Sequence, residues 1–318
     1  MKRVIITDCD HESIDIERKI FSDANVELEL FQCRTEDELI EKCGDCEVFI
    51  NQYAPISERV IKSLPDMKMV VRYGVGVNNI DVAAAAKHGV QVCNVPDYGM
   101  NEVADHALAL TMALVRKLSV MDRQTKKVKW DYAQSVPIKR LSCCVVGVVG
   151  LGRIGRAYAA RMRALGCTII GYDPYYRPCA EDETDFIRLV TMDELIQASD
   201  IISLHCPLEG NRNLINAGAF RKMKDTVYII NTTRGGIINE ADLDNALERG
   251  EIAGAGLDVF DKEPMSPDSH IFRYENIICT PHMAWYSEEA AIDLKRKAAE
   301  EALRFLRGEA VKYPVNRV

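Results

Sequence analysis

The sequence has 318 residues, which is long enough for two domains of ordinary size, each with its own hydrophobic core. Its hydrophobic content of 47% and charged content of 28% are those of a globular protein and exclude a disordered chain. The formal net charge of −8 opposes non-specific binding to nucleic acid or to an anionic membrane.

The amino-terminal residues Lys2 and Arg3 lead directly into a short strand pattern, too brief for the core of a signal peptide. No apolar stretch is long enough to span a membrane. We therefore expect a cytoplasmic protein that binds neither membrane nor nucleic acid. The 11 cysteines lie mostly within apolar strand patterns, as reduced core thiols do. Cys43 and Cys46 form a Cys-x-x-Cys pair, but no second such pair and no His pair at ligand spacing accompanies it, so a turn is predicted there and no metal site.

The first hundred residues alternate short apolar strand patterns with helical ones, which predicts a small α/β unit. The expected strands are residues 4–7, 26–30, 48–50, 69–71 and 90–93.

A linker then precedes a long apolar helix. Residues 94–99 contain Pro96 and Gly99 and are typical of a linker, and Asn101 is placed to cap a helix over residues 102–117. The apolar stretch within this helix is too short for a membrane span and has charged residues on both sides. We expect a buried helix that joins two domains, with His106 in a packing role.

A nucleotide-binding fingerprint follows a buried strand over residues 143–149. Gly150 permits a tight turn, Gly152 lets the backbone approach a pyrophosphate, and Gly155 lets the next helix pack closely on the strand. The helix over residues 153–165 begins with Arg153 and Ile154, so the phosphates are expected at its positive end. Gly166 is suited to end it.

An acidic residue stands where a dinucleotide fold needs one. The next strand, residues 168–172, ends at Asp173, 23 residues after Gly150, where a carboxylate accepts hydrogen bonds from ribose hydroxyls. A carboxylate there favours NAD over NADP, because it repels the 2′-phosphate of NADP. Arg177 leaves NADP open as an alternative, the other reading being a solvated surface arginine.

The remaining strand patterns, residues 201–204, 227–231, 256–260 and 277–280, extend a doubly wound parallel sheet. The last helix, residues 288–307, has no strand after it and is expected to return to the first domain. The predicted domains are residues 1–98 with 284–318, and residues 99–283.

Ligands bind at the carboxyl ends of the strands in such sheets. Three of these strand ends are followed by residues whose side chains could act in catalysis. They carry Arg234, Glu263 and His282. Arginine offers a planar fork for a carboxylate, histidine titrates near neutrality, and a glutamate within reach favours the protonated imidazole. Each residue alone also has a plain structural explanation, but the joint placement predicts a nicotinamide-dependent enzyme acting on a carbonyl. His205 is a rival acid, although we expect it to line the cofactor cleft.

Over nearly its whole length the chain resembles the D-2-hydroxyacid dehydrogenase family. The resemblance rests on residues 71–81, 94–96, 150–155, 205–208, 231–236, 257–264 and 280–282. It implies two doubly wound parallel-sheet α/β domains, flavodoxin-like and Rossmann-like, with the active site in the cleft between them.

The resemblance also implies roles for individual residues. Arg234, Glu263 and His282 become the catalytic residues, and NADH reduces a small 2-oxo acid. The substrate-binding set that it implies is Arg72, Tyr73, Gly74, Val75, Gly76 and Trp285. Besides the fingerprint and Asp173, the implied cofactor-binding set is Val103, His205, Cys206, Pro207, Thr232, Thr233 and Asp258.

The phrase from Pro281 to Ala290, with Trp285 followed by Tyr-Ser-Glu, is similar to that of carboxyl-terminal binding proteins and their bacterial relatives. Trp285 packs a domain joint or lines the pocket, and in the second case it favours an uncharged 2-oxo acid over a phosphorylated one. Arg72 lies near the substrate or pairs with an acid. The alternatives are a 3-phosphoglycerate dehydrogenase, a glyoxylate or hydroxypyruvate reductase, and an NAD(H)-sensing dimeric scaffold. A homodimer is implied, with Trp130 and Tyr132 supplying aromatic surface.

Overall fold

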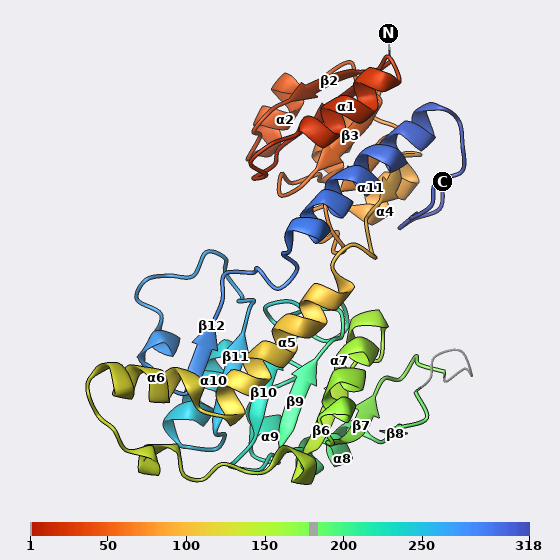
Figure 1. Ribbon diagram of the computed structural model, residues 1–318. Helices are drawn as coiled ribbons and strands as arrows, with labels where there is room; N and C mark the ends of the chain where they lie inside the picture. The colour runs from red at the N-terminus through yellow and green to blue at the C-terminus, as the bar shows by residue number, and fades with distance from the viewer. Residues whose placement is uncertain (1, 178–183) are drawn as a thin grey trace. The chain divides into compact units, whose positions relative to one another are not determined.

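The computed structural model describes residues 2–177 and 184–318 (Figure 1). The chain divides into two compact units. Unit 1 comprises Met1–Gly99 and Ser287–Val318, and unit 2 comprises Met100–Tyr286. Each unit is an α/β fold built on a parallel sheet, which confirms the predicted fold class.

Unit 1 has a five-stranded sheet in the order β2-β1-β3-β4-β5, the order of flavodoxin-like folds. Its strands are β1 (Arg3–Ile6), β2 (Glu27–Leu30), β3 (Val48–Asn51), β4 (Met69–Arg72) and β5 (Gln91–Cys93). Its helices are α1 (Asp15–Asp23), α2 (Glu36–Lys42), α3 (Glu58–Ser63), α4 (Val82–Lys87) and α11 (Glu288–Leu306). In a parallel sheet all carboxyl ends lie at one edge, so the segments that follow β1, β3 and β4 are neighbours.

Helix α11 completes unit 1 from the far end of the sequence. It packs against α1, β3 and β4, beside α1 in Figure 1. Its buried face is made mainly of alanine and leucine, which lets it lie close to the sheet. After α11 the chain runs along β5, where the N–H of Val315 donates to the carbonyl of Val92 at 2.8 Å.

Unit 2 has a seven-stranded sheet in the order β12-β11-β10-β9-β6-β7-β8, a Rossmann order with its switch point between β6 and β9. Its strands are β6 (Val145–Val149), β7 (Thr168–Tyr172), β8 (Ile187–Leu189), β9 (Ile201–Leu204), β10 (Tyr228–Asn231), β11 (Gly254–Leu257) and β12 (Ile277–Cys279). Its helices are α5 (Met100–Val115), α6 (Leu118–Lys126), α7 (Arg153–Ala164), α8 (Met192–Ala198), α9 (Ala217–Phe220) and α10 (Glu240–Glu248). The 3₁₀ turns among its described residues are η1 (Tyr132–Ser135), η2 (Leu141–Cys143) and η4 (His270–Arg273).

The starts of α5 and β11 differ from the prediction for physical reasons that the structure shows. Helix α5 begins at Met100, so Asn101 lies inside its first turn and does not cap it; the Asn101 side chain instead accepts a hydrogen bond from Arg161 at 3.2 Å. Strand β11 begins at Gly254, before the predicted start at 256. A Cβ at Gly254 would lie 2.2 Å from the carbonyl oxygen of Asn276, so close packing requires glycine at this position. Because glycine is not typical of strands, the sequence does not indicate that the strand begins there.

The segment between Cys43 and Cys46 is a turn, as predicted, with Asp45 in the left-handed region at φ +54°. Among residues 2–177 and 184–318, no group of three His, Cys, Asp or Glu is arranged to hold a metal ion. Within the same ranges, no helix is both long and apolar enough to cross a membrane.

Candidate active site

The turn between β6 and α7 leaves room for a phosphate. A Cβ at Gly150, which has φ +91°, would lie 2.6 Å from backbone atoms after β9, and a Cβ at Gly155 would lie 2.0 Å from the Gly150 carbonyl oxygen. Beside Gly152, by contrast, the space is open to at least 4 Å. Arg153 and Ile154 begin α7, whose first N–H groups have no partner inside the helix. The turn therefore fits a pyrophosphate at the positive end of a helix.

The Asp173 carboxylate is fixed beside this turn. Its Oδ2 accepts a hydrogen bond from the N–H of Leu151 at 2.8 Å, and its Oδ1 accepts from the N–H groups of Tyr175 and Tyr176 at 2.9 and 3.1 Å. Arg177 turns to two carbonyl oxygens of its own segment, at 3.1 and 2.9 Å. The group beside the glycine turn is thus an acid suited to a ribose diol.

His205, which follows β9, is a half-buried imidazole whose Nδ1 is buried. Its Nε2 lies 2.8 Å from the Ser203 hydroxyl, and its ring lies 5.2 Å from that of Tyr158. Burial lowers the pKa of His205 to about 3, so its imidazole is uncharged at neutral pH. An uncharged imidazole does not support His205 as the rival acid. The neighbouring Cys206 is half-buried, and burial raises the pKa of its thiol to about 11, while Pro207 is exposed.

Glu263 and His282 come together from the ends of β11 and β12. The Nδ1 of His282 lies 2.6 Å from the Oε2 of Glu263, and the other oxygen of Glu263 accepts from the N–H of Phe260 at 2.9 Å. Burial by itself would raise the pKa of Glu263. The hydrogen bonds from His282 and Phe260, together with the charges of His282 and Arg234, hold that pKa below its usual value. The carboxylate is therefore ionised beside the imidazole at neutral pH.

Arg234 follows β10 in a tightly held loop. The side-chain amide of Asn231 donates to the carbonyl of Arg234 at 2.9 Å and accepts from the N–H of Thr233 at 3.1 Å. A Cβ at Gly235 would lie 1.9 Å from the Phe260 carbonyl oxygen, so this loop packs directly on the segment after β11. The structure thus brings the predicted arginine, glutamate and histidine to one edge of the sheet.

In the same loop, the Thr232 hydroxyl is buried and has no hydrogen-bond partner among the described protein atoms. A buried polar group without a partner is costly unless a ligand or water satisfies it. Together with the open turn at Gly152, it shows that the residues present fit a bound dinucleotide.

The loop that presents His282 is anchored by the buried carboxylate of Asp258. That carboxylate accepts hydrogen bonds from the Thr280 hydroxyl at 2.5 Å and from the N–H groups of Met283 and Ala284 at 3.0 and 2.9 Å. The N–H of His282 donates to the Asp258 carbonyl at 2.8 Å, and His282 adopts the left-handed conformation at φ +55°. A single acid therefore holds most of the turn around the histidine.

His106 belongs to this support, which sequence reasoning missed. Its Nε2 lies 3.0 Å from the Thr280 hydroxyl oxygen and 3.8 Å from the Asp258 carboxylate. Because the Thr280 hydrogen is directed at Asp258, the His106 Nε2–H is the donor in the first contact. The available signal was a histidine at the start of the apolar stretch of α5, and α5 also carries the predicted, half-buried Val103.

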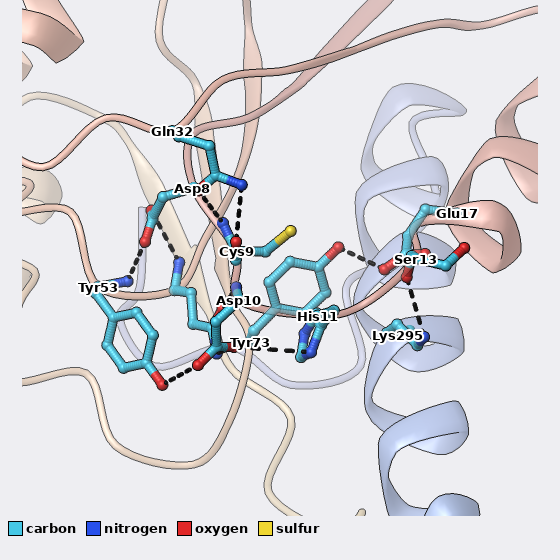
Figure 2. A network of polar contacts seen from close by, with 11 residues as sticks. Asp8, Cys9, Asp10, His11, Ser13, Glu17, Gln32, Tyr53, Tyr73 and Lys295 are labelled. Atoms are coloured by element: carbon cyan, nitrogen blue, oxygen red, sulfur yellow. Dashed lines mark hydrogen bonds and ion pairs between the residues drawn. The ribbon is translucent and has the colours of Figure 1, made fainter.

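The predicted substrate loop of unit 1 follows β4. Arg72, the last residue of β4, lies so close over Gly74 that a Cβ at Gly74 would come within 1.7 Å of an arginine nitrogen. Tyr73 is buried, and its hydroxyl donates to the Oε1 of Glu17 at 2.7 Å, so its side chain faces the interior (Figure 2). The side chain of Val75 is exposed and Gly76 is half-buried, so this part of the loop is accessible.

Trp285 follows the anchored turn in unit 2. It is half-buried, and its ring packs edge-to-face against that of Tyr286 with the centroids 5.5 Å apart.

Residues 108–284 match the sequence profile of the NAD binding domain of D-isomer specific 2-hydroxyacid dehydrogenases. A D-3-phosphoglycerate dehydrogenase of Archaeoglobus fulgidus is 35% identical over 99% of this chain. The chain spans only 59% of that relative's length. A glyoxylate reductase of Korarchaeum cryptofilum is 38% identical, over 85% of this chain and 83% of that protein. Among solved structures, an acyclic imino acid reductase in complex with NADPH and D-Arg has a TM-score of 0.88 and 27% identity, covering both chains completely.

Proposed function

The chain belongs to the D-isomer specific 2-hydroxyacid dehydrogenases, and we propose that it reduces a small 2-oxo acid to the D-2-hydroxy acid with NADH. One observation carries this proposal. It is the pairing of His282 with Glu263 at 2.6 Å, with the charge of Arg234 acting on the same carboxylate. A proton donor, a group that orients it and a cation are what the reduction of a 2-oxo acid requires.

His282 is the proton donor in this proposal. Because Glu263 occupies its Nδ1, the Nε2–H is the proton that passes to the carbonyl oxygen as the alkoxide forms. Glu263 orients the ring and stabilises its positive charge. Arg234 presents a planar fork that binds the substrate carboxylate and polarises the carbonyl. In the direction of oxidation, the same imidazole accepts the proton from the hydroxyl group.

We assign the dinucleotide to the turn Gly150, Gly152 and Gly155, to Arg153 and Ile154, and to Asp173. Asp173 supports NAD over NADP, because its carboxylate disfavours a 2′-phosphate and Arg177 is directed at its own backbone. When bound, NADH supplies the hydride for the reduction. The further residues assigned to cofactor binding are Val103, His205, Cys206, Pro207, Thr232, Thr233 and Asp258.

We assign the substrate to the domain formed by residues 1–98 and 284–318, and NAD to residues 99–283. In the first domain the backbone N–H groups of Val75 and Gly76 bind the substrate carboxylate, with Arg72 beside them. The exposure of Val75 supports this assignment. The buried Tyr73 contributes through its backbone, because its hydroxyl is committed to Glu17.

The substrate in this proposal is an uncharged 2-oxo acid, such as glyoxylate or hydroxypyruvate. We assign Trp285 to the wall of the substrate pocket, where its large and mainly apolar ring favours an uncharged substituent over a phosphate group. A phosphorylated 2-oxo acid is the alternative, and the relatives include proteins named for each.

We also propose that the protein is a cytoplasmic homodimer. Among the exposed large hydrophobic side chains of the described residues, Val128 and Trp130 are each 92% exposed and Tyr132 is 79% exposed. Three such side chains within five residues form an apolar segment that supports burial against a second copy of the chain.

The test is reduction of a panel of 2-oxo acids with NADH and NADPH, by the wild type and by His282→Ala. The panel comprises glyoxylate, hydroxypyruvate, pyruvate, phosphohydroxypyruvate and branched or aromatic 2-oxo acids. We expect His282→Ala to lower kcat on the order of 10²- to 10⁴-fold while the Kd for NADH changes little, since general acid catalysis contributes that much. Turnover that survives the substitution would contradict the role of His282. Tight NADH binding with slow turnover of every substrate would instead support a dimeric NAD(H)-sensing scaffold.

A further inference from the structure

The carboxyl end of the sheet in unit 1 carries acidic groups that the proposed mechanism does not use. Asp8 and Asp10 follow β1, and Tyr53 follows β3, which lies between β1 and β4. The register places Ile6 opposite Ile50 and Asn51 opposite Arg72, so the three strands end nearly level. The ends of β1 and β4 therefore lie about two strand spacings, roughly 9 Å, apart, and Asp10 lies in the segment that follows β1.

The Asp10 carboxylate is held in place by two neutral side chains of the segment that follows β3, one of which is the Tyr53 labelled in Figure 2. Gln52 forms a reciprocal pair with Asp10: its Nε2 donates to the carboxylate at 2.5 Å, and its Oε1 accepts from the N–H of Asp10 at 2.8 Å. The hydroxyl of Tyr53 donates to the other carboxylate oxygen at 2.9 Å. The hydrogen bonds from Gln52 and Tyr53 thus hold the exposed Asp10 carboxylate in one orientation.

Tyr53 links Asp10 to the substrate loop electrostatically. Burial raises the pKa of Tyr53 to about 12, and the charge and hydrogen bond of Asp10 act in the same direction. The charge of Arg72 opposes them, so the Tyr53 hydroxyl lies within the fields of both Asp10 and Arg72. It remains a donor at neutral pH and keeps Asp10 fixed. The Tyr53 side chain is 50% exposed, so the group it holds faces the accessible edge.

Among the described residues, no lysine or arginine forms an ion pair with Asp10 within 4 Å. Its ion-pair neighbour is His11, whose Nδ1 lies 3.9 Å away. Burial lowers the pKa of His11, with Asp10 and Lys295 acting in opposite directions, so the imidazole is neutral at pH 7. Asp8 lies behind it as a buried carboxylate that accepts from the N–H of Tyr53 at 2.7 Å.

We propose that Asp10, held by Gln52 and Tyr53, selects the substrate by charge, disfavouring 2-oxo acids with a second anionic group and favouring those with a neutral or cationic substituent. This inference rests on the proposed function, because it takes the substrate carboxylate to be bound at the loop after β4. A substituent on C3 then extends along the strand ends toward β3 and β1. At an effective dielectric of about 20 to 40, like charges about 9 Å apart change a rate constant on the order of tenfold.

The experiment compares kcat/KM for phosphohydroxypyruvate and hydroxypyruvate with NADH, in the full-length wild type and in Asp10→Asn. Asparagine has the shape of aspartate without its charge. We expect the ratio of phosphohydroxypyruvate to hydroxypyruvate to rise about tenfold in Asp10→Asn, which corresponds to 1.4 kcal/mol. The ratio for a guanidinium-bearing 2-oxo acid over hydroxypyruvate should fall by a similar factor.

Asp23→Asn is the matched control, because it removes the same charge from an exposed position at the end of α1 and should leave both ratios unchanged. The wild-type phosphohydroxypyruvate ratio should also rise with ionic strength, a readout that needs no substitution. Ratios within twofold of each other in the wild type and Asp10→Asn, with no dependence on salt, would overturn the inference while the proposed function stands. A wild type that reduces no 2-oxo acid would overturn the proposed function and this inference with it.

Discussion

The anchoring of the His282 turn by Asp258 leads to a quantitative prediction for Asp258→Asn. The wild-type carboxylate is 1% exposed and accepts three hydrogen bonds, from Thr280, Met283 and Ala284. The asparagine amide must turn its NH₂ group toward one of these donors, so at least one hydrogen bond to a charged group is lost and a donor is left unsatisfied. The free energy of unfolding of unit 2 should fall by about 2 to 4 kcal/mol. For a domain of this size that corresponds to a decrease in Tm of roughly 5 to 12 °C.

The same substitution should lower turnover. Displacement of a catalytic group by about 1 Å costs on the order of 10²-fold in rate, and the turn that loses its anchor carries His282. The assay pairs thermal unfolding, followed by circular dichroism, with kcat for the best 2-oxo acid. Asp268→Asn, an exposed position in the same unit, is the control and should match the wild type in both measurements. An Asp258→Asn protein with the Tm and kcat of the wild type would refute the reasoning.

Three further predictions concern other parts of the chain. Asp173→Ala should reduce the preference for NADH over NADPH about tenfold or more, measured as the ratio of kcat/KM values, since it removes a charge that repels the 2′-phosphate; an unchanged ratio would contradict this role. Burial raises the pKa of Glu17, so its contribution to stability is fully present below its unfolded value near pH 4.5 and is lost as pH rises through the folded value. Glu17→Gln, which does not titrate, should therefore show a flatter urea midpoint from pH 4 to 9 than the wild type, and parallel profiles would refute this. Trp130→Ser should weaken the proposed dimer in sedimentation velocity, whereas an unaltered association would exclude this segment from the interface.

Most of the fold could be predicted because its strands are short, buried and apolar. The strand at Thr168–Tyr172 and the strand at Ile201–Leu204 were predicted with the bounds observed. The start of β11 was predicted two residues late, since Gly254 has low β propensity although close packing requires glycine there. β8, with only three residues, carries too little pattern to be recognised.

The candidate site divides in the same way. Arg234, Glu263 and His282 could be found because a parallel sheet gathers its strand ends at one edge, so the topology alone predicts that they meet. The residues that support the candidate site from other elements could not be predicted from the sequence. His106 contacts a threonine 174 positions away, and Glu17 contacts a tyrosine 56 positions away. Such pairs depend on how helices pack on the sheet, and no spacing in the sequence reports that.

The left-handed backbone of His282 sets stability against activity at one position. Most residues with a Cβ are disfavoured by roughly 1 kcal/mol or more in that region, whereas glycine, and asparagine through local hydrogen bonds of its side chain, adopt it more readily. Selection for heat resistance alone would thus favour replacing this histidine. The selected variants would be more stable to heat but would lack the proposed proton donor. Any laboratory evolution of this chain toward higher temperature should therefore keep turnover in the screen from the first round.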